Sequence, residues 1–460
     1  MKPNANDAFN TKDVQDVYLN YKYDFRKKIA VPKTNDNPVT TPPVFSFMMC
    51  VYNDTSILNA ALNSLISQSF TAWELIALDN SDHNPEAFQM LQNAMDYDAR
   101  IQCFKGDRSY GWAKGSSLCL ERAKGIYTTF LASDDCLPKD ILSKVYAAVS
   151  EEKPDVLWVG NSFVVCNAER NQFEACQSVI PTKASYPAEH RADSIVEIMS
   201  NCYYNAFFHY MRIDFLKENQ INFFEPYYAD CAGMTHALVT SEHMACLDEA
   251  AYYLTVSTSQ TSGNYVWDSY DFMFLQQWRD VRTVLIKENV TNLKTTAYIC
   301  ERIGRNLYGQ LDALCKGFCR DKFMNSLQKS PADIVLQLEE VFAQSDFAEL
   351  TAWSTVSFEE LLDYFADTYK KNQNFADAVS NSWLAPLFAF SCARENLELL
   401  CRFLLETENR CCVGFAYFSQ LAAAVDDETF AGLSGDIQVI AAKYSAYIET
   451  QPIYPWELEG

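Results

Sequence analysis

The sequence predicts an α/β protein with a mostly parallel sheet flanked by helices, followed by an all-α carboxy-terminal domain. Between residues 44 and 160, short apolar runs of strand length alternate with segments of helical periodicity, which is typical of repeated βαβ units. From about residue 265, glycine and proline become scarce and helical spacing dominates. A chain of 460 residues exceeds one small module, so we divide it into residues 1–43, 44–264 and 265–460.

The first 43 residues mix charged side chains with asparagine and end in prolines that disfavour helix at the preceding positions. We expect an amino-terminal extension there, with one short helix within residues 14–29. The strands expected next are VFSFMMCVY (44–52), ELIAL (74–78), IQCF (101–104), IYTTFL (126–131) and DVLWVG (155–160). The helices expected between them cover residues 57–66, 85–95 and 118–124, and a further helix is opened by Pro138.

These strands are so apolar that both of their faces must be covered, which favours a three-layer arrangement around a mostly parallel sheet. Residues 161–264 are rich in aromatic side chains and show no period that assigns their elements. Beyond them, helical spacing places Ile299, Ile303, Leu307, Leu311, Leu314 and Phe318 near one face. We find no fixed repeat length, so a regular solenoid is not predicted.

The composition excludes several classes of protein. Hydrophobic residues make up 49% of the chain and charged residues 21%, as in an ordinary folded protein. The formal net charge of −23 repels nucleic-acid phosphates, so nucleic acid is not an expected partner. The 16 cysteines lie in apolar runs without a CxxC pair, and no signal peptide or transmembrane stretch is evident, so we expect reduced thiols and a cytoplasmic location.

Polar residues follow three of the expected strands. Tyr52 and Asn53 come after the first strand, Asp79 after the second, and the pair Asp134 and Asp135 after the fourth. Parallel strands end on one rim, where α/β sheets bind ligands. Adjacent carboxylates suit a hard divalent cation that neutralises a diphosphate, although an Asp-Asp pair before a helix can equally be a helix cap.

Three ordered segments carry a resemblance to a known family. They are VFSFMMCVYND (44–54), SLISQSFTAWELIALDNSD (64–82) and the stretch from DARIQCF to SDDCLPKDIL (98–142). This order resembles the family 2 glycosyltransferases of the GT-A fold, over roughly residues 44–255. The resemblance implies an enzyme that moves a sugar from a nucleotide-sugar donor, most simply a UDP-sugar, with Mn²⁺ or Mg²⁺ as cofactor.

The resemblance also implies roles for single residues. Tyr52, Asn53 and Asp79 would line the nucleoside pocket, Asp134 would approach the ribose or the metal, and Asp135 would hold the metal bound to the diphosphate. The segment INFFEPYYADCAGMTHAL (221–238) resembles the stretch that carries the family's base, which falls on Asp230. A plain helix N-cap is the alternative for Asp230.

The chain departs from the family pattern at several positions. Ala132 replaces a common aspartate of the metal motif, Ala229 replaces the first acid before Asp230, and Gly115, Ser116 and Ser117 replace a run that contains arginine. Lys114 and Arg108 are candidates for the missing positive charge, with a solvated loop residue as the alternative for each. His209 is a candidate contact of the donor phosphates, with a packed core histidine as the alternative.

These observations predict a metal-dependent inverting glycosyltransferase that acts on a glycan or glycoconjugate, in bacterial surface polysaccharide synthesis by family resemblance alone. Asp230 would deprotonate the acceptor hydroxyl in a direct displacement. The competing hypothesis is a non-catalytic nucleotide-sugar-binding or scaffold protein with a degenerate GT-A domain. The carboxy-terminal domain would bind acceptor or mediate homo-oligomer assembly. This domain also contains a group of basic residues, which could contact a membrane peripherally or form a solvated helix face. They are Arg302, Arg305, Lys316, Arg320 and Lys322.

Overall fold

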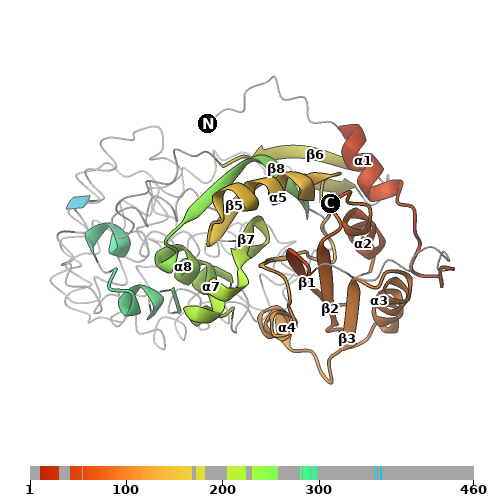
Figure 1. Ribbon diagram of the computed structural model, residues 1–460, viewed down its shortest axis with the longest axis horizontal. Coiled ribbons are helices and arrows are strands. Elements are labelled where there is room, and N and C mark those ends of the chain that lie inside the picture. Colours follow the sequence, from red (N-terminus) through yellow and green to blue (C-terminus); the bar gives the residue numbers. More distant parts are fainter. Residues whose placement is uncertain are drawn as a thin grey trace, which may run out of the picture. The chain divides into compact units, whose positions relative to one another are not determined.

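A single eight-stranded sheet organises the described part of the chain (Figure 1). The computed structural model describes residues 11–30, 42–53, 55–167, 172–181, 205–223 and 230–256, together with short pieces between 280 and 364. The strand order is β3-β2-β1-β4-β7-β5-β6, and β8 also pairs with β5. By its internal contacts the chain divides into residues 1–265 and 266–460. The helical carboxy-terminal domain predicted above and its basic group lie almost entirely outside the described residues.

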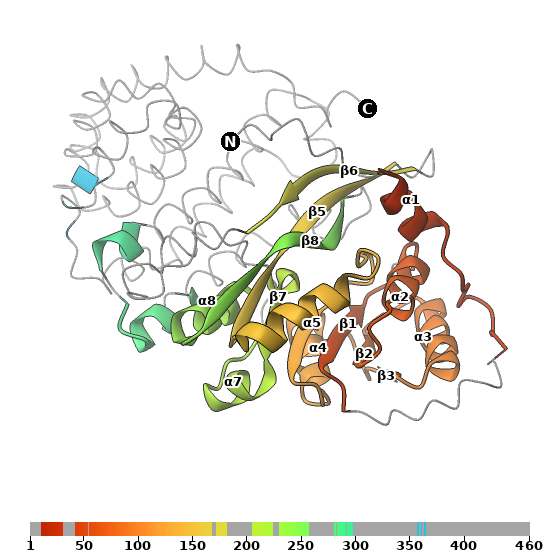
Figure 2. The same ribbon diagram turned by 45° about the horizontal axis from the view of Figure 1, so that its top comes forward.

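The first half of the sheet is parallel and confirms the βαβ prediction. Its strands are β1 (Phe45–Val51), β2 (Trp73–Asp79), β3 (Ile101–Lys105) and β4 (Tyr127–Phe130), and β1 pairs in parallel with both β2 and β4. The connecting helices α2 (Leu58–Ile66) and α3 (Pro85–Tyr97) lie on one side of these strands and α4 (Gly111–Leu120) lies on the other (Figure 2). All seven residues of β2 are buried, as expected for strands covered on both faces.

Helix α4 begins earlier than its sequence pattern indicates. We predicted a short helix at 118–124, whereas the helix spans Gly111–Leu120. Gly111 and Gly115 in this segment are typical of a loop, but Gly115 instead allows the helix to pack closely against the sheet. A Cβ at Gly115 would lie 2.8 Å from the Sγ of Cys50 and 3.0 Å from Cδ2 of Leu78, so α4 approaches β1 and β2 as closely as glycine allows.

The second half of the sheet is mixed and covers the region that the sequence left unassigned. Strand β7 (His209–Arg212) runs antiparallel to both β4 and β5 (Val156–Asn167). Strand β6 (Gln172–Val179) is antiparallel to β5, whereas β8 (Met244–Val256) is parallel to it, with register shifts around Gly160. Helix α5 (Ile141–Glu152) precedes β5 and begins three residues after Pro138. Helices α7 (Ile213–Glu218) and α8 (Asp230–Thr240) follow β7.

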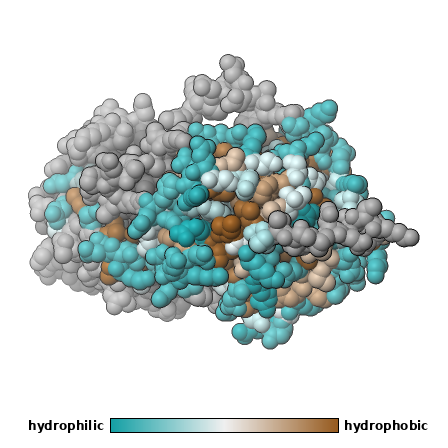
Figure 3. Space-filling model, in the orientation of Figure 1, coloured by the Kyte–Doolittle hydropathy of each residue, from teal (hydrophilic) through white to brown (hydrophobic). Residues whose placement is uncertain are grey.

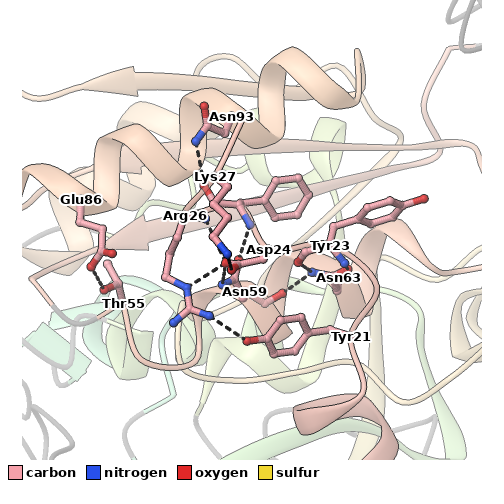
Figure 4. A network of polar contacts seen from close by, with 11 residues as sticks. Tyr21, Tyr23, Asp24, Arg26, Lys27, Thr55, Asn59, Asn63, Glu86 and Asn93 are labelled. Carbon is pink, nitrogen blue, oxygen red and sulfur yellow. Dashed lines mark hydrogen bonds and ion pairs between the residues drawn. The ribbon is translucent and has the colours of Figure 1, made fainter. Parts of the chain in front are cut away.

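The amino-terminal segment, residues 11–28, is built into this domain. Helix α1 (Thr11–Leu19) packs on β6 and α2, and the chain then runs along α2 and α3. Three asparagines of α2 and α3 hold its backbone (Figure 4). Asn63 bonds both the N–H and the carbonyl of Tyr23, at 2.9 and 2.7 Å, Asn59 accepts from the Phe25 N–H, and Asn93 donates to the Phe25 carbonyl. These buried amide contacts make the segment a fixed part of the fold.

The face of the molecule in Figure 3 is mostly hydrophilic, with apolar side chains gathered near the middle of the view. Ile126 and Tyr146 are among the exposed large apolar side chains of the described residues, and Tyr146 stacks on Phe70. Among the described helices, none has both the length and the apolar composition needed to span a bilayer.

Candidate functional site

The carboxyl ends of β1, β2 and β3 meet on one rim, as predicted. Val51 pairs with Asp79, and Asp79 pairs with Lys105 on the next strand. The Asp79 side chain is fully buried, and its Oδ1 accepts a hydrogen bond of 3.1 Å from the Ser81 N–H. Lys105 Nζ lies 3.5 Å from Oδ2, which accepts no hydrogen bond from the described residues. Oδ2 is therefore a buried oxygen whose charge faces Lys105 and which has no hydrogen-bond donor among the described residues.

Tyr52 and Asn53 extend the same rim beyond β1. The Tyr52 hydroxyl donates to Asp82 Oδ2 at 3.1 Å, and the Tyr52 ring is half-buried. Asn53 has a left-handed backbone with φ of 54°, a conformation that asparagine tolerates better than most residues. Its N–H donates to Ser81 Oγ at 2.9 Å and its Oδ1 accepts from the His83 N–H at 3.2 Å, so the loops after β1 and β2 are locked together.

Asn80 connects this rim to α4, a role that the sequence analysis missed. Its Oδ1 accepts from the Tyr110 N–H at 2.7 Å, and its Nδ2 donates to the Gly111 carbonyl at 3.2 Å. The amino end of α4 is thereby fixed beside Asp79. Lys114 lies in the first turns of α4 with a half-buried side chain. The positive end of a helix and a lysine next to a rim suit an anionic ligand.

The turn after β4, residues 132–136, is joined to β8 and carries two carboxylates, Asp134 and Asp135, which differ in burial. Asp135 is buried, with Oδ1 accepting from the Thr255 N–H at 2.7 Å and Oδ2 from the Tyr252 hydroxyl at 2.8 Å. Burial and the neighbouring charge of Asp134 raise the pKa of Asp135 well above its usual value, although both hydrogen bonds oppose the rise. Asp134 is half-buried, and its main-chain carbonyl accepts from the Thr255 hydroxyl.

The expected role of Asp135 as a metal ligand therefore needs correction. Both of its oxygens already accept hydrogen bonds inside the protein, so the carboxylate faces β8 instead of the rim. Among the described residues, no group of three His, Cys, Asp or Glu side chains could hold a metal ion by itself. A divalent cation bound to a diphosphate can nonetheless rely on one or two protein carboxylates. To serve as such a ligand, Asp135 would have to give up or share its hydrogen bonds from Thr255 and Tyr252.

Asp230 is the first residue of α8 and lies beside the 3₁₀ turn η2 (Ala206–Phe208). Desolvation raises the pKa of Asp230 to about 6, while main-chain N–H groups of Ala206 and of the first turn of α8 oppose the rise. Contacts through η2 connect it to the turn after β4, because the rings of Phe207 and Phe208 lie 5.9 and 5.5 Å from that of Tyr252. A carboxylate with a pKa near neutrality can accept a proton.

His209 lies inside the sheet. The residue is fully buried in β7, its ring stacks on Trp158 at 6.5 Å, and its Nδ1 lies 3.1 Å from the Asn205 carbonyl oxygen. Burial lowers the pKa of His209 to about 4, so the imidazole is neutral at physiological pH. A buried neutral ring offers no charge to a diphosphate, which corrects the expected contact in favour of a packed histidine.

Tyr252 and Thr255, which hold the turn after β4, were not predicted from the sequence. Both lie in β8, within the segment AYYLTV, which reads as a plain apolar strand. The only available signal was the presence of three hydroxyl groups, on Tyr252, Tyr253 and Thr255, in an otherwise apolar run. That signal does not identify a partner 117 to 120 residues away.

Part of this chain is similar in sequence to known proteins. Residues 46–211 match the model of glycosyl transferase family 2. An uncharacterised glycosyltransferase of Haemophilus influenzae is 30% identical over 132 residues, which are 29% of this chain and 52% of that protein. The Escherichia coli UDP-Glc:alpha-D-GlcNAc-diphosphoundecaprenol beta-1,3-glucosyltransferase WfgD is 29% identical over 90 residues, 20% of this chain and 34% of that enzyme.

A crystal structure of TarS residues 1–349 from S. aureus, in complex with UDP-GlcNAc, aligns with a TM-score of 0.49 at 16% identity, covering 89% of this chain and 93% of that one. The chain spans about half the length of the Haemophilus protein and a third of WfgD. The matched segment runs from the start of β1 to β7 and contains the whole rim that carries Tyr52, Asp79 and Asp134. Residues 46–211 therefore form a glycosyl transferase family 2 domain.

Proposed function

We propose that this protein transfers a sugar from a nucleotide-sugar donor to a glycan or glycoconjugate acceptor, with inversion at the anomeric carbon. One observation carries the proposal: the strands of the parallel half bring Tyr52, Asp79 and the turn with Asp134 to one rim, inside the segment that matches the family model. Ligands of α/β sheets bind at such rims. Asp230, beside η2, supplies a candidate base.

The nucleoside would bind at the β1 and β2 end of the rim. The buried Asp79 oxygen that accepts no hydrogen bond within the described residues suits the N–H of a pyrimidine base, and the Tyr52 ring offers a flat face beside it. Uridine has such an N–H, and the similar enzyme WfgD is named for a UDP-sugar donor. We therefore propose a UDP-sugar as donor.

The diphosphate would lie between the amino end of α4 and Asp134. Main-chain N–H groups of the first turn of α4 and the half-buried Lys114 favour negative charge there. Mn²⁺ or Mg²⁺ held by Asp134 would neutralise charge on the departing diphosphate. Asp135 contributes indirectly, because its bonds to Thr255 and Tyr252 fix the turn that presents Asp134.

Asp230 would remove the proton of the acceptor hydroxyl as that oxygen attacks the anomeric carbon. Its pKa of about 6 leaves it mostly ionised at neutral pH and still basic enough to take the proton in the transition state. A single positioned base requires no covalent enzyme intermediate, and attack from the face opposite the leaving group inverts the configuration. General base catalysis of this kind contributes about 10²- to 10⁴-fold in rate.

The acceptor class and the setting follow from the relatives and are proposals for this chain. WfgD is named for a glucosyl transfer to a diphosphoundecaprenol-linked sugar, so we propose bacterial surface polysaccharide synthesis as the setting. The seven free cysteines among the described residues are compatible with the cytoplasmic location expected from the sequence.

The test measures both donor hydrolysis and transfer with the full chain, using a panel of UDP- and GDP-sugars in the presence of MnCl₂. Asp230→Asn should lose at least about 100-fold in turnover while UDP affinity stays within twofold of wild type. Asp214→Asn is the matched control, because Asp214 is an exposed acid in the first turn of α7 and should change neither quantity. If wild type binds UDP but turns over no donor with any acceptor tested, the non-catalytic binding hypothesis replaces this one.

A further inference from the structure

The turn after β4 is contacted by a residue from the opposite end of the domain's sequence. Tyr18, in α1, is buried, and its hydroxyl lies 2.9 Å from Thr255 Oγ1, 237 positions away in the chain. Its ring stacks on Phe173 with centroids 4.4 Å apart, and Gln15 Nε2 donates to the Phe173 carbonyl at 2.6 Å. Tyr18 therefore occupies a fixed position between the amino-terminal segment and β8.

The hydrogen-bond directions in this contact can be worked out. A hydroxyl has one hydrogen, and Thr255 uses its own to donate to the Asp134 carbonyl. Thr255 Oγ1 must then accept from Tyr18, whose hydroxyl stays protonated because burial raises the pKa of Tyr18 well above its usual value. The Tyr253 carbonyl, at 3.5 Å, is at the limit of hydrogen bonding and competes weakly for that proton.

Thr255 thus bonds three groups at once. It accepts from Tyr18, donates its hydroxyl proton to the Asp134 carbonyl, and donates its main-chain N–H to Asp135 Oδ1 at 2.7 Å. The Thr255 side chain is completely buried, so no water replaces a missing partner at low cost. Loss of the Tyr18 hydroxyl would remove the hydrogen bond that helps to orient the Thr255 hydroxyl toward the Asp134 carbonyl.

We propose that Tyr18 is a positioning residue for the donor site: its hydroxyl orients Thr255, and Thr255 holds the Asp134–Asp135 turn that follows β4 at the rim. This inference rests on the proposed function for its link to donor binding, while its structural part is independent of it. It makes the amino-terminal segment a component of the nucleotide-sugar site, although the segment lies outside the residues that match the family model.

The experiment compares Tyr18→Phe with Tyr23→Phe in the full chain. Both variants lose one phenol hydroxyl from the amino-terminal segment, but the Tyr23 main chain bonds Asn63 of α2, and its ring lies tilted against that of Tyr97 in α3 with centroids 4.4 Å apart. Hydrogen exchange of peptides covering residues 130–138 and isothermal titration with UDP plus MnCl₂ are measured for each. We expect faster exchange in that peptide and a Kd for UDP raised about 2- to 10-fold in Tyr18→Phe, corresponding to one buried hydrogen bond, and neither change in Tyr23→Phe.

A double-mutant cycle tests whether Tyr18 acts through Thr255. Thr255→Val removes the shared hydroxyl and Thr255→Ser keeps it, so only the valine variant should reproduce the effects of Tyr18→Phe, and the two changes combined should not add. Unchanged exchange at residues 130–138 in Tyr18→Phe, or a UDP affinity equal to that of Tyr23→Phe, overturns the proposal. If wild type binds no UDP, the proposed function and the donor role of Tyr18 fail together, and the exchange data alone decide whether Tyr18 orders the turn.

Discussion

The two neighbouring aspartates of the turn after β4 should respond in opposite ways to substitution. Asp135→Ala removes the acceptor for two buried donors, the Thr255 N–H and the Tyr252 hydroxyl. An unsatisfied buried donor costs about 1–3 kcal/mol, so we expect the free energy of unfolding to fall by about 2–6 kcal/mol. Asp134→Ala keeps the main-chain carbonyl that accepts from Thr255 and should cost under about 1 kcal/mol.

The ligand-binding changes should run the other way. Asp134→Ala should abolish the part of UDP affinity that depends on MnCl₂, because we propose Asp134, half-buried in the turn after β4, as the metal ligand. Asp135→Asn, which keeps one acceptor oxygen and so remains folded, should retain that dependence. Urea unfolding monitored by circular dichroism gives the stabilities, and titration of UDP with and without MnCl₂ gives the affinities. The assignment of Asp134 as the metal ligand would be refuted by the opposite result. In that result, Asp135→Asn loses the dependence of UDP affinity on MnCl₂ at unchanged stability, and Asp134→Ala keeps it.

Three further predictions concern other parts of the domain. Burial alone would raise the pKa of Asp155, but hydrogen bonds from Arg212 and two main-chain N–H groups outweigh it and lower the pKa. The stability that Asp155 contributes is therefore present above about pH 4 and is lost as the pH falls through the lowered pKa. In urea unfolding, Asp155→Asn should lose less stability on acidification than wild type. The kcat/KM of the wild-type enzyme should decline below about pH 6, as Asp230 becomes protonated. Gly115→Ala should destabilise the domain by about 1–3 kcal/mol in urea unfolding, because its Cβ would lie 2.8 Å from Cys50 Sγ.

The parallel half of the sheet could be predicted from sequence because each of its strands is a continuous apolar run. Strand β2 is buried at every position, so its run of apolar residues is interrupted by few polar ones. Strand β8 mixes buried, half-buried and exposed positions without strict alternation, and its register against β5 shifts at Gly160. Such shifts break the two-residue period on which strand prediction depends, so residues 161–264 showed no assignable pattern.

The rim could likewise be predicted in outline. Parallel strands in register bring their carboxyl ends together whatever their sequences, so Tyr52, Asp79 and Asp134 had to share an edge once the βαβ order was recognised. The direction of each side chain could not be predicted in this way, because it depends on partners supplied by other elements. His209 illustrates the limit: its environment is set by Trp158 on β5, which is paired with it only in the folded sheet.

Asp134 and Asp135 show why neighbouring acids in a sequence do not define a shared metal site. Cys136 forms an extended bridge with Tyr253, so the chain leaves the turn alongside β8. Residues 133 and 134 lie in a turn just before this bridge, and the turn places the Asp135 carboxylate against β8, where both of its oxygens accept hydrogen bonds. A buried carboxylate needs donors there, and Tyr252 and Thr255 supply them. Asp135 thus joins the turn to β8, and Tyr252 and Thr255 are the residues of β8 that satisfy its two buried oxygens.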